Sequence, residues 1–510
     1  MTLRSVLLDQ PSPLRFGTSG RRGRVRELTQ LEIYVNVFGE IEYLVSQSPD
    51  QGGIARGSEF YVAQDLRPSS ASIREAVEEA VRDSGMWPVS LGTVPTPALA
   101  CYAWSLGRAG IMVTGSHIPF DWNGYKLNTA RGELMKSDEA PINARVAAVR
   151  ERIYAEPAAQ SKFDAHGQLK RHSALSAPLP DARAFYARRY TDFFGGRSLA
   201  GMRILLYEHS AVGRDLLREI LESFGAEVVP AGRSENFVPI DTENIESTTL
   251  ASLQEMADCF APLDAIVSTD GDSDRPLVLG LEDGAVRFFP GDIVGLVTAE
   301  FLGADAVVVP VSCNDAIDRG NLRAVLEPKT RIGSPYVIAG MEAARTRGCT
   351  AVCGWEANGG FLLGSDLVRD GRILSALPTR DAVLPILSVL FAARAARLDL
   401  PSLFAQLPPR YTHSTLIREF PRALGLRLVA RLTGADFEPL FGPASSADRT
   451  DGLRLTFASS DVLHLRPSGN ADEFRIYACT DTRERASEIT RRGAEAMRNF
   501  ASSAPADESN

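Results

Sequence analysis

The stretch DAIVSTDGDSDR, residues 264–275, joins an apolar, strand-like run to a loop that carries three alternating aspartates. Two other stretches have the same plan, GIMVTGSHIP at 110–119 and CTAVCGWEANGG at 349–360. In open α/β sheets, ligands bind beyond the carboxyl ends of the strands. We therefore expect these three loops to converge on one site.

The segments around these strands alternate between helical and extended patterns. Helices are expected at 29–45, 70–83, 212–224, 248–260, 291–302 and 335–347, and further strands at 59–63, 202–208 and 306–312. This alternation predicts an α/β structure with mixed, mainly parallel sheets. After about residue 400, strands at 453–457, 461–465 and 475–480 and a helix at 482–500 instead predict a smaller α+β domain.

The expected domain boundaries follow from this pattern. Three related α/β domains are expected to occupy residues 1–165, 180–280 and 281–400, and the α+β domain residues 401–500. An Ala-, Pro- and Ser-rich segment at 156–182 is the expected connection between the first two, and 501–510 is expected to be a disordered tail.

Composition narrows the class of protein. A chain of 510 residues with 44% hydrophobic and 23% charged residues can form several globular cores, and its net charge of −9 argues against a general nucleic-acid binder. No signal peptide or membrane-spanning apolar run is evident. Six cysteines without a CxxC pair are expected to be reduced thiols, which predicts a cytoplasmic protein. The sequence leaves the choice between monomer and dimer open.

Asp270, Asp272 and Asp274 form a candidate metal site. Three carboxylates this close repel one another unless a cation joins them, and hard oxygen ligands suit Mg²⁺ or Ca²⁺. An EF-hand is excluded, since its sixth position would be Arg275 and its twelfth Leu281. Mg²⁺ is favoured because it needs few protein carboxylates and accepts a phosphate oxygen. The alternative is a solvated acidic turn.

Ser116 is a candidate nucleophile at the end of a strand. GSHIP is not a G-x-S-x-G elbow, which argues against a serine hydrolase. A hydroxyl there can carry a phosphoryl group if a metal neutralises the charge. On extended backbone, the side chain of His117 is expected to point away from Ser116. Lys126 follows in DWNGYK, where the alternative is a surface lysine.

Three further loops could hold a sugar phosphate. RPSGNADEFR at 466–475 combines two arginines, a serine and a glycine, and RFGTSGRRGR at 15–24 combines glycines with basic residues, as in anion-binding turns. Glu356 of GWEANGG could bind sugar hydroxyls. Each loop could equally be a simple surface turn.

The order of these motifs resembles a known family. FGTSGRRG (16–23), TGSHIPFDWNGYK (114–126), DGDSDR (270–275), GWEANGG (354–360) and RPSGNADEFR (466–475) are similar to the five signatures of the α-D-phosphohexomutases, and they span nearly the whole chain. The resemblance implies four domains around a central cleft. It also implies interconversion of hexose 1-phosphate and hexose 6-phosphate through a phosphoserine and a hexose 1,6-bisphosphate intermediate, which also serves as activator.

The resemblance assigns roles residue by residue. Ser116 would be the phosphorylated nucleophile and would bind Mg²⁺ together with the three aspartates. Arg22, His117, Lys126 and Arg275 would complete the catalytic group, with Lys126 as general acid/base. The substrate-binding residues would be Glu356, Asn358, Gly359, Arg466, Ser468, Gly469, Asn470 and Arg475.

Three positions depart from the family pattern. Ile118 stands where asparagine is usual, Gly360 where mannose- and glucose-type members commonly have histidine, and Asn470 where threonine is usual. None removes the nucleophile or a metal ligand, so they bear on substrate choice. The serine loop is closest to the phosphomannomutase/phosphoglucomutase type, so mannose phosphate is expected first and glucose phosphate second. A phosphoglucomutase, a phosphoglucosamine mutase and a catalytically silent sugar-phosphate-binding relative are the alternatives.

Overall fold

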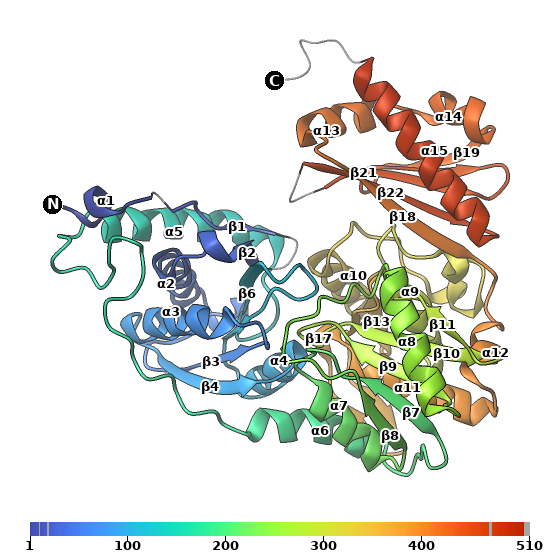
Figure 1. Cartoon of the computed structure of the whole chain (residues 1–510), viewed down its shortest axis with the longest axis horizontal. Helices are drawn as coiled ribbons and strands as arrows, with labels where there is room; N and C mark the ends of the chain where they lie inside the picture. Colours follow the sequence, from blue (N-terminus) through green and yellow to red (C-terminus); the bar gives the residue numbers. More distant parts are fainter. Residues whose placement is uncertain (10, 18–19, 469–471, 504–510) are drawn as a thin grey trace.

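The computed structural model describes residues 1–9, 11–17, 20–468 and 472–503. Four sheets of four to six strands organise the chain into four successive units (Figure 1). Three of these sheets are mixed and the fourth is antiparallel. The predicted fold class, three α/β parts followed by a smaller β-rich part, is confirmed.

The first unit carries TGSHIPFDWNGYK (114–126), the serine loop. Its sheet has the order β1-β2-β6-β5-β3-β4. The strands are β1 (Arg15–Phe16), β2 (Arg21–Arg24), β3 (Glu59–Gln64), β4 (Trp87–Thr93), β5 (Gly110–Val113) and β6 (Trp122–Asn128). The helices are α1 (Leu3–Val6), α2 (Gln30–Ser46), α3 (Ser70–Asp83), α4 (Thr96–Ser105) and α5 (Glu139–Tyr154).

The second unit carries DGDSDR (270–275), called the aspartate loop from here on. Its sheet has the order β11-β10-β9-β7-β8. The strands are β7 (Arg203–Tyr207), β8 (Glu227–Ala231), β9 (Ala265–Thr269), β10 (Pro276–Glu282) and β11 (Ala285–Phe289). The helices are α6 (Asp181–Phe193), α7 (Arg214–Ser223) and α8 (Ser247–Phe260).

The third unit carries the GWEANGG loop. Its sheet has the order β12-β13-β14-β17, and a separate hairpin pairs β15 (Leu367–Arg369) with β16 (Arg372–Leu374). The sheet strands are β12 (Ala306–Val308), β13 (Val352–Trp355), β14 (Phe361–Leu363) and β17 (Leu377–Asp381). The helices are α9 (Gly291–Leu302), α10 (Ser334–Thr346), α11 (Val383–Ala396) and α12 (Leu400–Phe404).

The fourth unit has an antiparallel sheet of order β18-β22-β21-β20-β19. The strands are β18 (Tyr411–Arg418), β19 (Ala444–Asp448), β20 (Leu453–Phe457), β21 (Val462–Pro467) and β22 (Glu473–Thr480). The helices are α13 (Arg422–Arg431), α14 (Gly434–Phe441) and α15 (Arg483–Ser502). Because α15 continues to Ser502, the tail predicted from 501 begins too early; residues 504–510 lie outside the described residues.

The prediction that parallel pairing predominates is wrong. In each of the first three units, one strand pairs in parallel with a neighbour and ends at a motif loop. After the loop, the next strand runs back antiparallel to that first strand. These pairs are β5 with β6, β9 with β10, and β13 with β14. The loops are too short for the helical crossover that a parallel return would need, so the return strand must be antiparallel.

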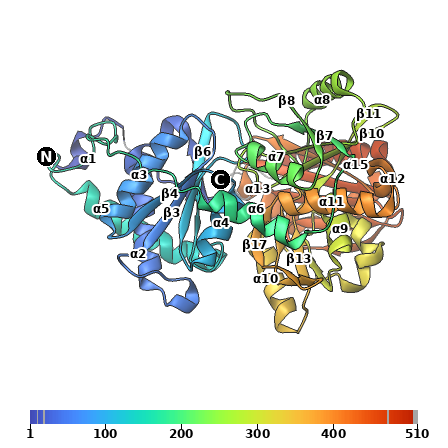
Figure 2. The same ribbon diagram turned by 90° about the horizontal axis from the view of Figure 1, so that it is seen from below.

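The hydrophobic cores show how the units are joined. One core cluster runs from Tyr61 to Phe404 through the first three units, whereas the fourth unit has its own cluster between Ile417 and Met497. Figure 2 shows the first unit beside the block formed by the second and third, and in Figure 1 the fourth unit stands above that block. The fourth unit therefore has a hydrophobic core of its own.

Local sequence signals explain several boundaries. Thr29 and Glu32, three residues apart, predict a capping box at the start of α2, and the Thr29 side chain does accept a hydrogen bond from the backbone N–H of Glu32. The Glu32 carboxylate does not complete the capping box, because it instead accepts hydrogen bonds from Arg150 and Tyr154. The connection 155–180 contains isolated bridges but no helix or strand. Within the described chain, no helix has both the length and the apolarity to cross a membrane.

Candidate active site

Ser116 lies directly beyond β5 and is completely buried. Its hydroxyl donates a hydrogen bond of 2.7 Å to Asp270 Oδ2, across the boundary between the first and second units. Its backbone N–H donates to Thr114 Oγ1 at 2.8 Å. The serine and aspartate loops therefore meet, as the shared strand-end position predicted.

The expectation that His117 points away from Ser116 is wrong. Ser116 has a φ of 54°, in the left-handed region, so the backbone turns and the two side chains come together. His117 Nδ1 lies 3.4 Å from Ser116 Oγ and accepts a hydrogen bond of 2.9 Å from Arg275 Nη1. Burial and the adjacent Arg275 and Arg22 lower the pKa of His117 well below its ordinary value, so the imidazole is neutral.

Arg67 holds the serine loop in this conformation. Its guanidinium donates hydrogen bonds to the backbone carbonyls of Ser116, Ile118, Pro119 and Trp122. The same group lies over the ring of Phe237 in the second unit, with Cζ 3.7 Å from the ring centroid. These four hydrogen bonds from one buried cation tie the serine loop to the connection that follows β3.

Asp270, Asp272 and Asp274 are completely buried and form the group of carboxylates suited to a metal ion. One oxygen from each lies within 4.8 Å of the others. Asp272 Oδ1 and Asp274 Oδ1 are buried and accept no hydrogen bond from the described residues. Buried anionic oxygens left without donors are the expected ligands of a cation, so this donor set fits Mg²⁺.

Besides Ser116, three cations and the hydroxyl group of Thr96 contact the aspartates. Lys126 Nζ donates to Asp272 Oδ2 and to Asp274 Oδ2, both at 2.6 Å, and Thr96 Oγ1 donates to Asp272 Oδ2. Lys126 is only 6% exposed, which excludes the surface-lysine alternative. Arg380 Nε donates to Asp274 Oδ2 at 3.0 Å, and Arg275 Nε lies 3.5 Å from Asp274 Oδ1.

These charges shift the pKa values of Asp270 and Asp274 in opposite directions. Burial and the neighbouring Asp272 and Asp274 raise the pKa of Asp270 well above its ordinary value. Burial alone would also raise the pKa of Asp274, but Arg380, Lys126 and Arg275 hold it below its ordinary value. Asp274 is therefore firmly ionised, whereas the ionised form of Asp270 requires additional positive charge nearby to be stabilised.

Arg22 is a further positively charged side chain at this site. Burial and repulsion from Arg275 lower its pKa to about 10, so it stays charged at neutral pH. Its side chain forms no hydrogen bond or ion pair with the described residues. Its neighbour Arg21 has a structural role instead, since its guanidinium is buried and donates to Glu40 at 2.7 Å. Residues 18 and 19 of this motif lie outside the described residues.

The GWEANGG loop is a tight turn between β13 and β14. Glu356 Oε2 accepts a hydrogen bond of 3.1 Å from Arg380 Nη1. Asn358 Oδ1 accepts from the Gly360 backbone N–H at 3.0 Å, which leaves its NH₂ group for other partners. Gly359 has a φ of 85° and would clash with Gly291 if it carried a Cβ, so glycine is required there.

The predicted phosphate-binding residues lie on the fourth unit. Arg466 of β21 pairs with Asp451 at 2.9 Å, Ser468 follows β21, and Arg475 lies in β22. Gly469 and Asn470 lie outside the described residues. Arg466 and Arg475 make no hydrogen bond or ion pair with the groups around Ser116 in the described chain. The structure thus brings together the residues of the first three units, and keeps those of the fourth separate.

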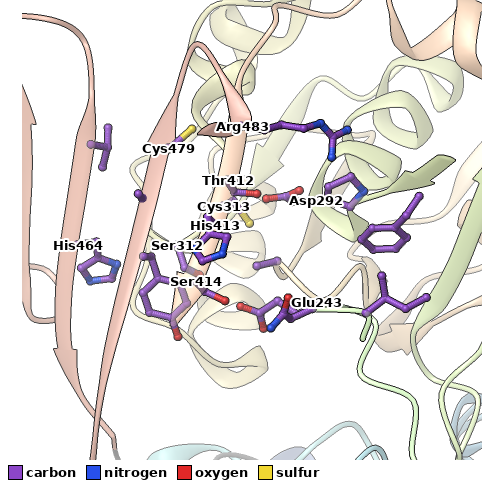
Figure 3. Close-up of a pocket in the computed structure, with 18 of the residues that line it drawn as sticks. Glu243, Asp292, Ser312, Cys313, Thr412, His413, Ser414, His464, Cys479 and Arg483 are labelled. Atoms are coloured by element: carbon purple, nitrogen blue, oxygen red, sulfur yellow. The ribbon is translucent and has the colours of Figure 1, made fainter. Parts of the chain in front are cut away.

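A cavity of about 680 Å³ lies where the fourth unit meets the second and third (Figure 3). Thr412, His413 and Ser414 of β18 line one side, and Glu243 and Asp292 line the other. Ala357 of the GWEANGG loop also reaches its wall. The cavity therefore lies between part of the fourth unit and the two units below it.

Several residues of the site were not identified from the sequence. They are Asp65, Arg67, Thr96, Glu133 and Arg380. Glu133 accepts hydrogen bonds from Ser334 and Thr379 and so joins the first unit to the third. The sequence does carry a signal for Asp65 and Arg67, because both come just after the end of β3, in the same position relative to a strand as the motif loops. For Glu133 and Arg380 no local pattern distinguishes them from other charged residues.

Comparison with known proteins agrees with this geometry. Residues 13–152, 188–282 and 290–411 match the descriptions "Phosphoglucomutase/phosphomannomutase, alpha/beta/alpha" domain I, domain II and domain III. A phosphomannomutase of Sinorhizobium fredii is 40% identical over 486 residues, covering 94% of this chain and 98% of the relative. A phosphomannomutase of Salmonella muenchen is 39% identical over 484 residues, covering 94% of each.

A solved structure extends the comparison to the fold. The phosphoglucomutase/phosphomannomutase family protein of Burkholderia thailandensis superposes with a TM-score of 0.69 at 19% identity, covering 96% of this chain and 98% of that one. At that identity the likeness concerns the fold alone.

Proposed function

The chain belongs to the phosphoglucomutase/phosphomannomutase family of α-D-phosphohexomutases, and we propose that it interconverts mannose 1-phosphate and mannose 6-phosphate. It is an isomerase that works by phosphoryl transfer. Mannose is proposed because two relatives that share about two fifths of their residues with it are phosphomannomutases. Glucose phosphate is proposed as a weaker substrate.

The observation that carries the reaction is the short contact between Ser116 Oγ and Asp270 within a buried carboxylate cluster. Asp270, Asp272, Asp274 and the Ser116 oxygen would hold Mg²⁺. When bound, Mg²⁺ supplies positive charge that offsets the negative charge of a phosphoryl group on the serine. Arg67 keeps the serine loop fixed, and a fixed nucleophile reduces the entropy cost of transfer.

In the proposed cycle, the phosphorylated Ser116 transfers its phosphoryl group to the free hydroxyl of the hexose phosphate. The oxygen–phosphorus bond to Ser116 breaks as the bond to the sugar oxygen forms, and Lys126 would take up the proton of that hydroxyl. Lys126 would return a proton to the sugar oxygen that is released in the second transfer. The product is a hexose 1,6-bisphosphate, which must turn over in the cleft. Its other phosphoryl group then returns to Ser116, so the same bisphosphate also acts as the activator.

The remaining residues are proposed to hold the substrate. Arg22 and Arg275 would neutralise the phosphoryl group in transfer, and neutral His117 would orient Arg275 beside Ser116. Glu356, Asn358 and Gly359 would contact sugar hydroxyls. Arg466, Ser468, Gly469, Asn470 and Arg475 would bind the phosphate that does not react. Movement of the fourth unit would bring them to the ligand.

A coupled assay tests the proposal. Purified protein is incubated with mannose 1-phosphate, Mg²⁺ and a trace of glucose 1,6-bisphosphate, and mannose 6-phosphate formation is followed. The wild type should turn over and carry a phosphoryl group on Ser116, detected by intact mass. S116A should lose both, while S210A, at a buried serine outside the cluster, should retain both.

The alternatives predict different results. Turnover of glucose or glucosamine 1-phosphate in preference to mannose 1-phosphate would point to a phosphoglucomutase or a phosphoglucosamine mutase. Binding of a hexose phosphate without turnover or phosphorylation would identify a catalytically silent relative. The cytoplasmic location and the choice between monomer and dimer stay predictions from the sequence.

A further inference from the structure

Arg380 connects the two loops that the proposed reaction uses for metal and for sugar. It lies in β17, which pairs antiparallel with β14, and β14 begins immediately after the GWEANGG loop. The pairing sets Asp381 opposite Phe361, and the side chain of Arg380 lies against Gly360. Although it is the long side chain of an edge strand, Arg380 is only 2% exposed.

Its guanidinium joins two buried carboxylates from different units. Nε donates to Asp274 Oδ2 at 3.0 Å, and Nη1 donates to Glu356 Oε2 at 3.1 Å. Nη1 also lies 3.4 Å from Ser334 Oγ. Within the described chain, no other side chain donates a hydrogen bond to the Glu356 carboxylate. The orientation of Glu356 therefore depends on Arg380.

Gly360 is glycine because the Arg380 side chain occupies the adjacent space. A Cβ built on Gly360 would lie 2.5 Å from Arg380 Cγ and closer still to Cδ, well inside van der Waals contact. The backbone of Gly360 is not in the left-handed region, so space and not conformation excludes a side chain. Since the guanidinium is held at both ends, the middle of the Arg380 chain cannot easily yield.

We infer that Arg380 is a positioning residue that sets the angle of Glu356 toward the sugar and ties that angle to the metal-binding Asp274, with Gly360 as its required neighbour. This inference rests on the proposed function. A lysine keeps the charge but offers a single ammonium group, which cannot span two carboxylates in the geometry of a guanidinium. The Gly360 departure is thus part of a paired arrangement with Arg380.

The first test compares R380K and R380M with R345M, a matched control at an exposed arginine of α10. Binding of mannose 6-phosphate is measured by calorimetry, which does not require turnover, and KM and kcat are measured for mannose and glucose 1-phosphates. R380M should weaken binding and raise KM about tenfold or more, with a smaller change in kcat. R380K should recover only part of this loss. The ratio of kcat/KM between the two sugars should also change.

The second test is a double-mutant cycle between positions 360 and 380, followed by the thermal midpoint. G360A should be destabilising in the presence of Arg380 and clearly less so in the R380A background, because Cγ and Cδ are then absent and only the Cβ of residue 380, at 3.1 Å, remains close. G132A is the control, since a Cβ there meets nothing within 4 Å.

The results distinguish the role of Arg380 from the proposed mutase activity. Wild-type affinity and sugar preference in R380M, or an equal cost of G360A in both backgrounds, would overturn the role of Arg380. A wild type that binds mannose 6-phosphate in an Arg380-dependent way but lacks turnover would instead contradict the proposed mutase activity alone.

Discussion

At the scale of single residues, the site pairs buried carboxylates with buried cations. Burial of either kind of charge without the other would be unfavourable. Lys126 is one of only five lysines among 55 basic residues, and it contacts two of the three aspartates. An arginine could supply the same charge here, but a guanidinium does not serve as a general acid/base, whereas a lysine amine can. A lysine at this position is therefore compatible with the proposed proton transfer in addition to charge neutralisation.

This argument predicts the behaviour of K126R and K126M. If Lys126 exchanges the proton of the sugar hydroxyl, both variants should lose about 10²- to 10⁴-fold in kcat, because neither retains a titratable amine. Steady-state kinetics with mannose 1-phosphate measures this. K162R, at a surface lysine of the 155–180 connection, should keep wild-type kcat. A K126R enzyme with normal kcat would show that the charge alone is needed.

At the scale of elements, each motif loop depends on a contact from outside its own strand pair. The serine loop is held by Arg67 from the β3–α3 connection, and Asp65 of the same connection accepts hydrogen bonds from Thr114 and Ser70. The left-handed conformation of Ser116 is uncommon for a residue with a side chain, so the surrounding contacts must impose it.

Removal of Arg67 should therefore loosen the serine loop. R67M leaves four carbonyls and the Asp65 carboxylate without their buried cation, and we expect a loss of about 3–5 kcal/mol in the free energy of unfolding. Hydrogen exchange at residues 116–122 should accelerate and kcat should fall. R82M, which breaks part-exposed pairs on α3, should cost less than about 1 kcal/mol. Unchanged exchange in R67M would contradict the scaffold role.

The antiparallel sheet of the fourth unit contains a pH-sensitive element, His464 of β21. Burial lowers the pKa of His464 to about 4, and its Nε2 lies 2.6 Å from the Asp451 carbonyl oxygen. Between pH 6.5 and 4 the unfolded chain binds a proton at this position that the folded chain does not bind. This difference makes stability fall as the pH falls through that range, by about 2 kcal/mol at pH 5.

The matched variant is H464Q, which retains a donor for the Asp451 carbonyl but cannot be protonated in this range. Urea unfolding at pH 7.5 and pH 5.0 should show a smaller loss of stability for H464Q than for the wild type. H166Q, at an exposed histidine, should behave like the wild type. Identical losses in H464Q and the wild type would exclude His464 as the cause.

At the scale of the whole molecule, the fourth unit is joined to the third by a group of ion pairs around Arg410 and by hydrogen bonds from Arg331 and Ile332 to Thr450 and Asp451. Arg410, just before β18, donates to both carboxylate oxygens of Asp315 at 2.6 and 2.9 Å and to Asp481 at 2.6 Å. The unit has its own core, and a cavity of about 680 Å³ separates part of it from the block below. A fixed pivot beside open space is the arrangement expected for rigid-body closure.

Closure should be measurable in solution. In the S116A variant, which cannot be phosphorylated at that position, hexose 1,6-bisphosphate should lower the radius of gyration measured by X-ray scattering. The R466M/R475M pair in the same background should abolish this change, because the fourth unit would lose two of its proposed phosphate ligands. An unchanged radius of gyration at saturating bisphosphate would rule out closure of this kind.

The sequence by itself determined the alternation of strands and helices, the three motif loops and the identity of the carboxylate cluster. These follow from local periodicity and from residue types at fixed spacing, which need no knowledge of distant contacts. The boundaries of α2, α3, α8 and α9 lie within one or two residues of their predicted limits for the same reason.

Only the tertiary structure decided which side chains complete the site. The approach of His117 to Ser116 depends on a single left-handed φ, and the roles of Arg67, Glu133 and Arg380 depend on partners tens to hundreds of residues away. The same is true of Gly360, whose missing side chain is explained by an arginine twenty residues later in the chain. Packing between units creates these contacts, and a pattern confined to neighbouring residues carries no information about them.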